Sequence, residues 1–141
     1  MIPSLSNGFN ILAILASGVG SLIIGFIWYG PLFGKPWSTY TGWTREKVAT
    51  VPGGQMALSY ILSFVAAVAQ ACVLTVFARG LGVTAWSDGL WIGLLAGVGF
   101  TALGFATTYL FEHKPTGLWL IVSGYEVVYL AGAAVIVTVW R

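Results

Sequence analysis

The chain has 141 residues, of which 58% are hydrophobic and only 7% are charged, and its formal net charge is +2. A soluble domain carries about 25% charged residues, so this composition excludes an ordinary water-facing surface and indicates one integral membrane domain over residues 1–141. The basic residues are scattered rather than clustered, which argues against nucleic acid as a partner and leaves the lipid bilayer as the surroundings.

Four apolar stretches are each close to the roughly 20 residues that cross about 30 Å of hydrocarbon as a helix. The connections between the second, third and fourth stretches are short, so these helices should be antiparallel neighbours. The sequence therefore predicts an all-α, four-transmembrane-helix antiparallel bundle. The expected helices cover residues 9–29, 55–78, 87–111 and 117–140.

Aromatic residues at the end of the first helix continue into the longest connection, residues 30–54. Three of them recur at every third position, so they share one face if this piece is helical, at the depth of the lipid headgroups. A lysine among them can reach the phosphates. We interpret the segment as an interfacial anchor between helices 1 and 2, and a lid over a ligand is the alternative. The expected headgroup contacts are Trp28, Tyr29, Lys35, Trp37, Tyr40 and Trp43.

Small residues recur at every fourth position in the first three helices, a pattern that lets backbones approach closely in lipid. The third helix has the strongest row, with Gly89, Gly93 and Gly97, and is expected to make a close helix contact. We interpret these rows as the inner seams of the bundle, although a row on an outer face would instead join protomers into an oligomer. The other rows are Ala13, Ser17, Ser21 and Gly25, and Ser59, Ser63, Ala67, Ala71 and Thr75.

Glu126 is an acid inside the last apolar stretch, where a charged side chain costs about 2.5 kcal/mol or more. At a rise of about 1.5 Å per residue, three hydroxyls lie near its depth, and a tyrosine flanks it at helical spacing. We expect the hydroxyls to donate to a largely protonated carboxyl. By the same rise Gln70 lies about 10 Å away in depth, which argues against direct contact. The predicted polar layer is Glu126, Ser21, Ser63, Thr101 and Tyr129.

Three roles for Glu126 stay open at this point. The carboxyl can hold the fourth helix in place through hydrogen bonds, or relay protons or bind an ion. It can also face a second subunit or the polar end of a lipophilic ligand.

Basic residues near the helix ends predict the orientation. The side of the first and third loops carries four of them, whereas the other side carries Arg79, Arg141 and the amino terminus. The positive-inside rule then places the first and third loops in the cytoplasm and both termini outside. The four basic residues are Lys35, Arg45, Lys47 and Lys114.

The sequence contains no catalytic or metal-binding constellation. His113 lies beside Glu112 with no second histidine, and zinc catalysis needs three protein ligands. Cys72 is alone in an apolar stretch, which leaves no CxxC motif and no internal disulfide. The GxSxG, P-loop and GxGxxG motifs are absent. We therefore expect no metal, no cofactor and no enzyme activity.

Residues 28–37 read WYGPLFGKPW. This segment resembles the signature G-x-x-WYGPLFGKxW of a family of small bacterial four-helix membrane proteins, known as a domain of unknown function. The resemblance implies the four-helix fold and a bacterial inner membrane, without an activity. Pro36 stands at a position that usually holds a small, helix-compatible residue in this family, and an acid at the position of Glu126 is not part of the pattern. Further positions that fit are Asn10 to Leu12, Gly25, Thr44 to Glu46, Leu110 to Glu112 and Gly124-Tyr125.

Two functions follow as hypotheses. The first is a non-enzymatic membrane protein, either a small homo-oligomer or an accessory subunit of a larger membrane complex, in contact with lipid or a lipophilic ligand. The alternative is a small transporter or proton-linked channel that uses the polar layer around Glu126.

Overall fold

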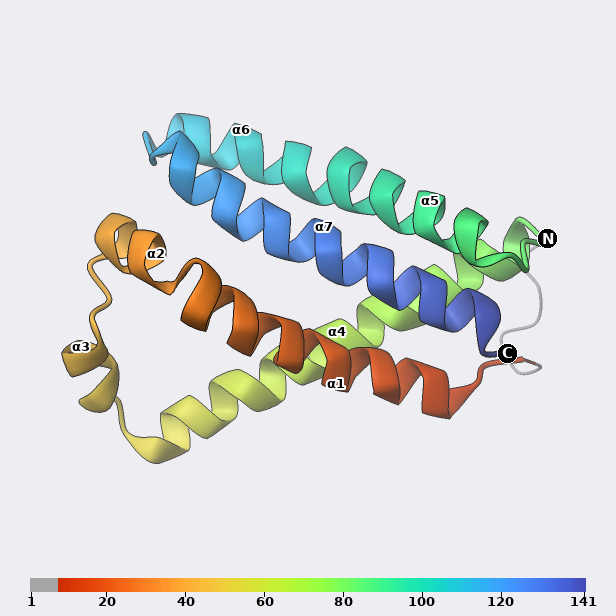
Figure 1. The fold of residues 1–141 in the computed structure, drawn as a ribbon, viewed down its shortest axis with the longest axis horizontal. Helices are drawn as coiled ribbons and strands as arrows, with labels where there is room; N and C mark the ends of the chain where they lie inside the picture. Colours follow the sequence, from red (N-terminus) through yellow and green to blue (C-terminus); the bar gives the residue numbers. More distant parts are fainter. Residues whose placement is uncertain (1–7) are drawn as a thin grey trace.

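The computed structural model describes residues 8–141 as a bundle of helices (Figure 1). Four helical spans are long and apolar enough to cross a membrane, and the described residues form no strand. The predicted all-α fold with four spans is therefore confirmed. The expected position of the amino terminus concerns residues that lie outside the described part of the chain. The spans are Ile11–Leu32, Gly53–Gly80, Trp86–Phe111 and Thr116–Val139.

Two of the four spans contain a π-helical turn, and two short helices fill the first connection. In chain order the elements are α1 (Ile11–Ile27), η1 (Trp28–Leu32), α2 (Gly34–Thr41), α3 (Arg45–Ala49), α4 (Gly53–Gly80), α5 (Trp86–Ala96), η2 (Gly97–Ala102), α6 (Leu103–Phe111) and α7 (Thr116–Val139).

The helix ends follow from the residues that stand there. Asn10 caps α1, because its side-chain oxygen accepts hydrogen bonds from the backbone N–H groups of Leu12 at 3.0 Å and Ala13 at 3.2 Å. The chain leaves α4 and α6 where Gly82 (φ 67°) and His113 (φ 53°) adopt the left-handed conformation. The N–H of the following residue then bonds back into the helix. These turns reverse the chain and make successive spans antiparallel.

The first span continues to Leu32 through the π turn η1. The N–H of Phe33 donates to the carbonyl oxygen of Trp28 at 2.8 Å, and the chain then bends into α2. A Cβ atom at Gly34 would lie 2.6 Å from the carbonyl oxygen of Tyr29. The bend therefore requires glycine at this position.

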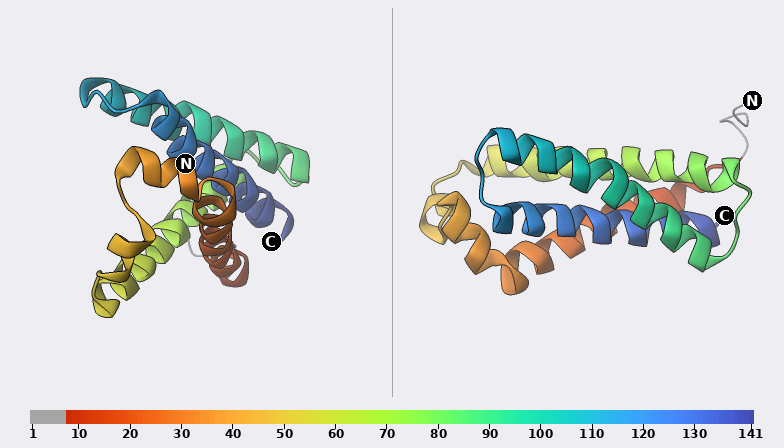
Figure 2. Two further views of the ribbon diagram at one scale, coloured as in Figure 1. Left: turned by 60° about the vertical axis from the view of Figure 1, so that its left-hand side comes forward. Right: turned by 90° about the horizontal axis from the view of Figure 1, so that it is seen from above.

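Helix α7 is the centre of the bundle. It packs against α1 and α4 as well as against the third span, and it contributes more buried residues than any other element (Figures 1 and 2). Small residues from α1 and α4 form the buried seams, as the sequence predicted. The exceptions are Gly25, which is half-buried, and Ser59 and Ser63, which are exposed because α4 diverges from α1 toward its amino-terminal end (Figure 1). The buried small residues are Ala13, Ser17, Ser21, Ala67, Ala71 and Thr75.

Helix α5 and η2 lie directly on α7 through a row of buried glycines, Gly89, Gly93 and Gly97. A Cβ atom at Gly93 would lie 2.5 Å from the Cα atom of Ala131, and one at Gly97 would lie 2.8 Å from the Cα atom of Val127. Real Cβ atoms essentially never come closer than 3.0 Å to another heavy atom. The two backbones can approach this closely only because side chains are absent at these positions.

The two ends of the bundle differ. Helices α2 and α3 lie at the same end as the turn between α6 and α7, whereas the carboxyl terminus and the α4–α5 turn lie at the opposite end (Figure 1). The first and third loops therefore share one side, as the arrangement of four spans requires.

Candidate intramembrane site

Glu126 of α7 faces Gln70 of α4 inside the bundle. The side-chain amide of Gln70 donates a long hydrogen bond of 3.5 Å to Oε2 of Glu126, and both residues are half-buried. The prediction that Gln70 lies too far away in depth was wrong. It treated the helices as level and upright, but α4 crosses the bundle obliquely (Figure 1), and two long side chains bridge the remaining offset.

The other residues of the predicted polar layer do not donate to Glu126. The hydroxyl of Ser21 donates to the carbonyl oxygen of Gly18 at 2.7 Å, and that of Ser63 donates to the carbonyl oxygen of Ser59 at 2.8 Å. Serine in a helix commonly bonds to the preceding turn in this way. Because each hydroxyl has one proton, neither has a second to give, and this part of the prediction was wrong.

The last two members of the predicted layer, Tyr129 and Thr101, lie on different helices. Tyr129 is buried, and its hydroxyl donates to the carbonyl oxygen of Ala67 in α4 at 2.5 Å. Thr101 lies half-buried in η2. The α4–α7 contact thus holds two polar links, one through Tyr129 and one through Glu126, and the predicted layer is divided between separate helix contacts.

The aromatic residues at the end of the first span turn toward the bundle. The indole N–H of Trp28 donates to the carbonyl oxygen of Ile121 in α7 at 2.9 Å. The ring of Tyr29 lies 5.8 Å from that of Trp37 and 5.5 Å from that of Tyr125, measured between centroids. These contacts fasten η1 and α2 to α7. Residues 28–37 therefore build a contact between helices, which their interpretation as a headgroup anchor did not include.

Of the remaining residues of the expected anchor, Lys35 and Tyr40 lie in α2 and Trp43 lies after it. Lys35 is exposed near the start of the helix, and the hydroxyl group of Tyr40 lies against Gly117 of α7. Trp43 lies beyond the helix, because Gly42 ends α2 in the left-handed conformation with φ 72°. The expectation that Trp43 shares a helix face with Trp37 and Tyr40 was therefore wrong.

A cleft with a volume of about 560 Å³ opens between α1, α3 and α4. Small-molecule sites typically have volumes of about 300–1,000 Å³, so the cleft is large enough for a ligand. Its wall is mainly apolar, with several hydroxyl groups and a single guanidinium group, that of Arg45. The residues that line it are Ser21, Leu22, Gly25, Phe26, Tyr29, Gly30, Arg45, Val48, Tyr60, Ser63 and Tyr125.

The cleft and the Glu126–Gln70 pair are neighbours along α7. Tyr125, which lines the cleft, directly precedes Glu126 in the chain, and its hydroxyl donates to the carbonyl oxygen of Ser21 at 3.1 Å. The half-buried acid therefore follows directly in the chain a hydrogen-bonded residue that lines the cleft.

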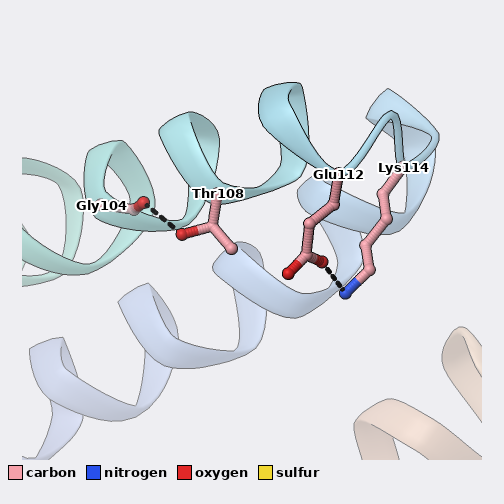
Figure 3. A network of polar contacts seen from close by, with 4 residues as sticks. All are labelled: Gly104, Thr108, Glu112 and Lys114. Atoms are coloured by element: carbon pink, nitrogen blue, oxygen red, sulfur yellow. Dashed lines mark hydrogen bonds and ion pairs between the residues drawn. The ribbon is translucent and has the colours of Figure 1, made fainter.

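The turn between α6 and α7 holds an ion pair outside the spans. Nζ of Lys114 lies 2.5 Å from Oε2 of Glu112, and Thr108 bonds to the carbonyl oxygen of Gly104 one turn earlier (Figure 3). The hydrogen bond that Lys114 donates to the carboxylate of Glu112 raises the pKa of Lys114 above its ordinary value. Within residues 8–141, no three His, Cys, Asp or Glu side chains form a group able to hold a metal ion.

Sequence reasoning gave too little weight to three residues of the site. Gln70 carries a polar amide in an apolar stretch, which is itself a signal of an internal partner, because an unpaired amide in lipid is costly. Tyr125 was marked only through the family resemblance. Arg45 enters the sequence analysis only as a basic residue of the first loop and within the family resemblance. Nothing local in the sequence shows that Tyr125 and Arg45 line one cleft.

The four apolar spans, of which three pack around α7, have an outer surface that is mostly apolar and exposed, and they define a multi-pass integral membrane protein. The chain belongs to the family described as Protein of unknown function (DUF1761), which matches residues 12–138 and so covers most of its length. This match confirms the family resemblance. The chain matches no curated protein and no solved structure.

Proposed function

We propose that this protein is a non-enzymatic membrane protein that holds a lipid or another lipophilic molecule in the cleft between α1, α3 and α4. The cleft itself carries the proposal: it has the volume of a ligand site, a mainly apolar wall and a few polar groups. It also lies between two membrane spans, where hydrocarbon chains are the surrounding solvent.

The exposure of α4 supports the proposal. All of the buried residues of α4 lie from Ala67 onward, so its first half, residues 53–66, contributes no buried side chain to the described bundle. This half of the helix forms one wall of the cleft through Tyr60 and Ser63. A bound amphiphile would cover apolar surface that the protein's own helices leave open.

The chemistry of the cleft favours binding over catalysis. Its two serines donate to backbone carbonyl oxygens, and within the described residues neither is bonded to a histidine or a carboxylate that would activate it as a nucleophile. The polar groups of the cleft are therefore suited to positioning a ligand.

Blocking the cleft tests the proposal. Purified protein in dodecyl maltoside should be stabilised against thermal unfolding by oleyl alcohol, since a ligand that binds the folded state raises its stability. Ser63→Phe places a ring in the cleft and should abolish this stabilisation. Ser59→Phe, one turn away and exposed but outside the cleft lining, should leave it unchanged. Equal stabilisation of the two variants would contradict the proposal.

We also propose that the protein works as a small homo-oligomer or as an accessory subunit of a larger membrane complex. The exposed serines Ser59 and Ser63 continue a small-residue row beyond the part buried by α1 and α7, and such rows allow close contact between helices. Native mass spectrometry in detergent tests this proposal. A bare monomer without a copurifying membrane subunit would count against it.

The proposed orientation in a bacterial inner membrane has the first and third loops in the cytoplasm. Support comes from the basic residues of α2, α3 and the α6–α7 turn, which lie at one end of the bundle. In a Cys72→Ala background, Lys47→Cys should react with an impermeant thiol reagent only after cell lysis, and Arg141→Cys should react in intact cells. The reverse pattern would contradict this orientation.

A second candidate function is proton-coupled transport, favoured by one observation. Glu126 and Gln70 form a polar pair inside the bundle, one residue from the cleft-lining Tyr125, and buried acids commonly serve proton pathways. Proteoliposome flux compared between the wild type and Glu126→Gln tests this function. Equal fluxes would exclude a role for the carboxyl.

A further inference from the structure

Charge is distributed unevenly along the cleft. Arg45, at the start of α3, is the only charged residue among the described residues that line it. It takes no part in the ion pair that the described residues hold, which joins Lys114 and Glu112. The guanidinium group is thus free to meet an anion, and its planar set of donors suits phosphate and carboxylate oxygens.

The inner part of the cleft carries no charged residue among the described residues that line it. The hydroxyl protons of Ser21, Ser63 and Tyr125 are all donated to backbone carbonyl oxygens, at 2.7, 2.8 and 3.1 Å. Ser63 lies ten residues into α4, which corresponds to about 15 Å from the first-loop end of the helix. Beyond Arg45 the cleft therefore extends deep into the span, with apolar walls from Leu22 and Phe26.

We infer that the cleft takes an amphiphile with an anionic phosphate or carboxylate headgroup, held by Arg45, and a hydrocarbon chain that runs inward toward Ser21 and Ser63. This inference rests on the proposed ligand-holding function and names the class of ligand. The same headgroup chemistry is found in bilayer lipids and in free single-chain amphiphiles.

Three probes with the same chain and different headgroups test the inference: oleyl phosphate, oleyl alcohol and oleylamine. Their affinities for the full-length protein in dodecyl maltoside are measured from thermal stabilisation as a function of probe concentration. Oleyl phosphate should bind about 10-fold more tightly than oleyl alcohol, since a charge-assisted hydrogen bond exceeds a neutral one. Oleylamine should bind most weakly.

Variants of α3 make the test specific. Arg45→Gln should remove the preference for oleyl phosphate, and Arg45→Lys should keep part of it. Lys47→Gln, on the same short helix but outside the cleft lining, should leave the affinities for oleyl phosphate and oleyl alcohol unchanged. Circular dichroism melting of each variant without probe verifies that it folds.

Lipid nanodiscs distinguish the source of the headgroup. If phosphatidylglycerol nanodiscs suppress oleyl phosphate binding and phosphatidylcholine nanodiscs do not, the ligand is a bilayer lipid; equal binding in both identifies a free amphiphile. Either result supports the anionic class. Equal affinity of the three probes, or a preference unaffected by Arg45→Gln, would overturn the inference and leave the proposed ligand site standing. Failure of all three probes to bind would overturn both.

Discussion

The contact between α5 and α7 predicts that Gly93→Ala destabilises the protein. A Cβ atom at this position would lie 2.5 Å from the Cα atom of Ala131, and closer still to the carbonyl oxygen of Leu130. Both are backbone atoms, so no side-chain rotation relieves the overlap. An ordinary contact begins at 3.4 Å, and the difference between 3.4 and 2.5 Å means that the helices must separate by about 0.9 Å.

Gly104→Ala in α6 is the matched control, because a Cβ atom there has no heavy atom within 4 Å. Both substitutions gain about 1 kcal/mol of helix propensity, which cancels when the two variants are compared. The difference that remains is the cost of overpacking, about 1–3 kcal/mol. Gly93→Ala should therefore have the lower free energy of unfolding by that amount.

The measurement is reversible unfolding in mixed dodecyl maltoside and sodium dodecyl sulfate micelles, followed by far-ultraviolet circular dichroism. Gly97→Ala should fall between the two variants, since its nearest backbone atom is 2.8 Å away. If Gly93→Ala is as stable as Gly104→Ala, α5 does not lie on α7 in this way, and the steric argument fails.

Three further predictions concern single polar contacts. Trp28→Phe removes the indole N–H that donates to α7 at 2.9 Å and should lower the free energy of unfolding by about 1 kcal/mol. Tyr129→Phe removes the buried hydroxyl that donates to α4 and should have a similar effect of about 1 kcal/mol. Glu112→Gln removes the partner that raises the pKa of Lys114, so this lysine should lose its proton at lower pH than in the wild type, as followed by NMR. Because the folded pKa is raised, any stability from the pair is complete below the ordinary lysine pKa and is lost as the pH rises through the folded value.

Matched control substitutions show whether each change in stability or titration comes from the named contact or from removing any aromatic polar group or any charge. Trp43→Phe and Tyr60→Phe change exposed residues for which the structure describes no side-chain hydrogen bond, and each should leave the free energy of unfolding nearly unchanged. Glu46→Gln should not alter the titration of Lys114. If a control variant matches its test variant, the contact in question contributes nothing measurable.

Much of the fold could be predicted because it depends on local properties of the chain. Membrane spans require about 20 consecutive apolar residues, and the breaks between them contain the glycine and proline residues that end helices. The glycine row of α5 was visible as a period of four residues. Such a row marks a close helix contact whichever helix is the partner. The sequence therefore predicts that the contact exists, but it does not show that α7 is the partner helix.

The sequence by itself therefore determined the number of spans, the small-residue seams and the presence of an acid within the last span. Only the tertiary structure decided which groups meet. Depth along a helix predicts a contact only if the helices are parallel and level, and the oblique course of α4 brings Gln70 to Glu126 despite the predicted offset. The cleft depends likewise on the divergence of α1 and α4 and on the placement of α3 at the first-loop end of the bundle (Figure 1). A void between helices is a property of their packing and leaves no periodic signal in any one of them.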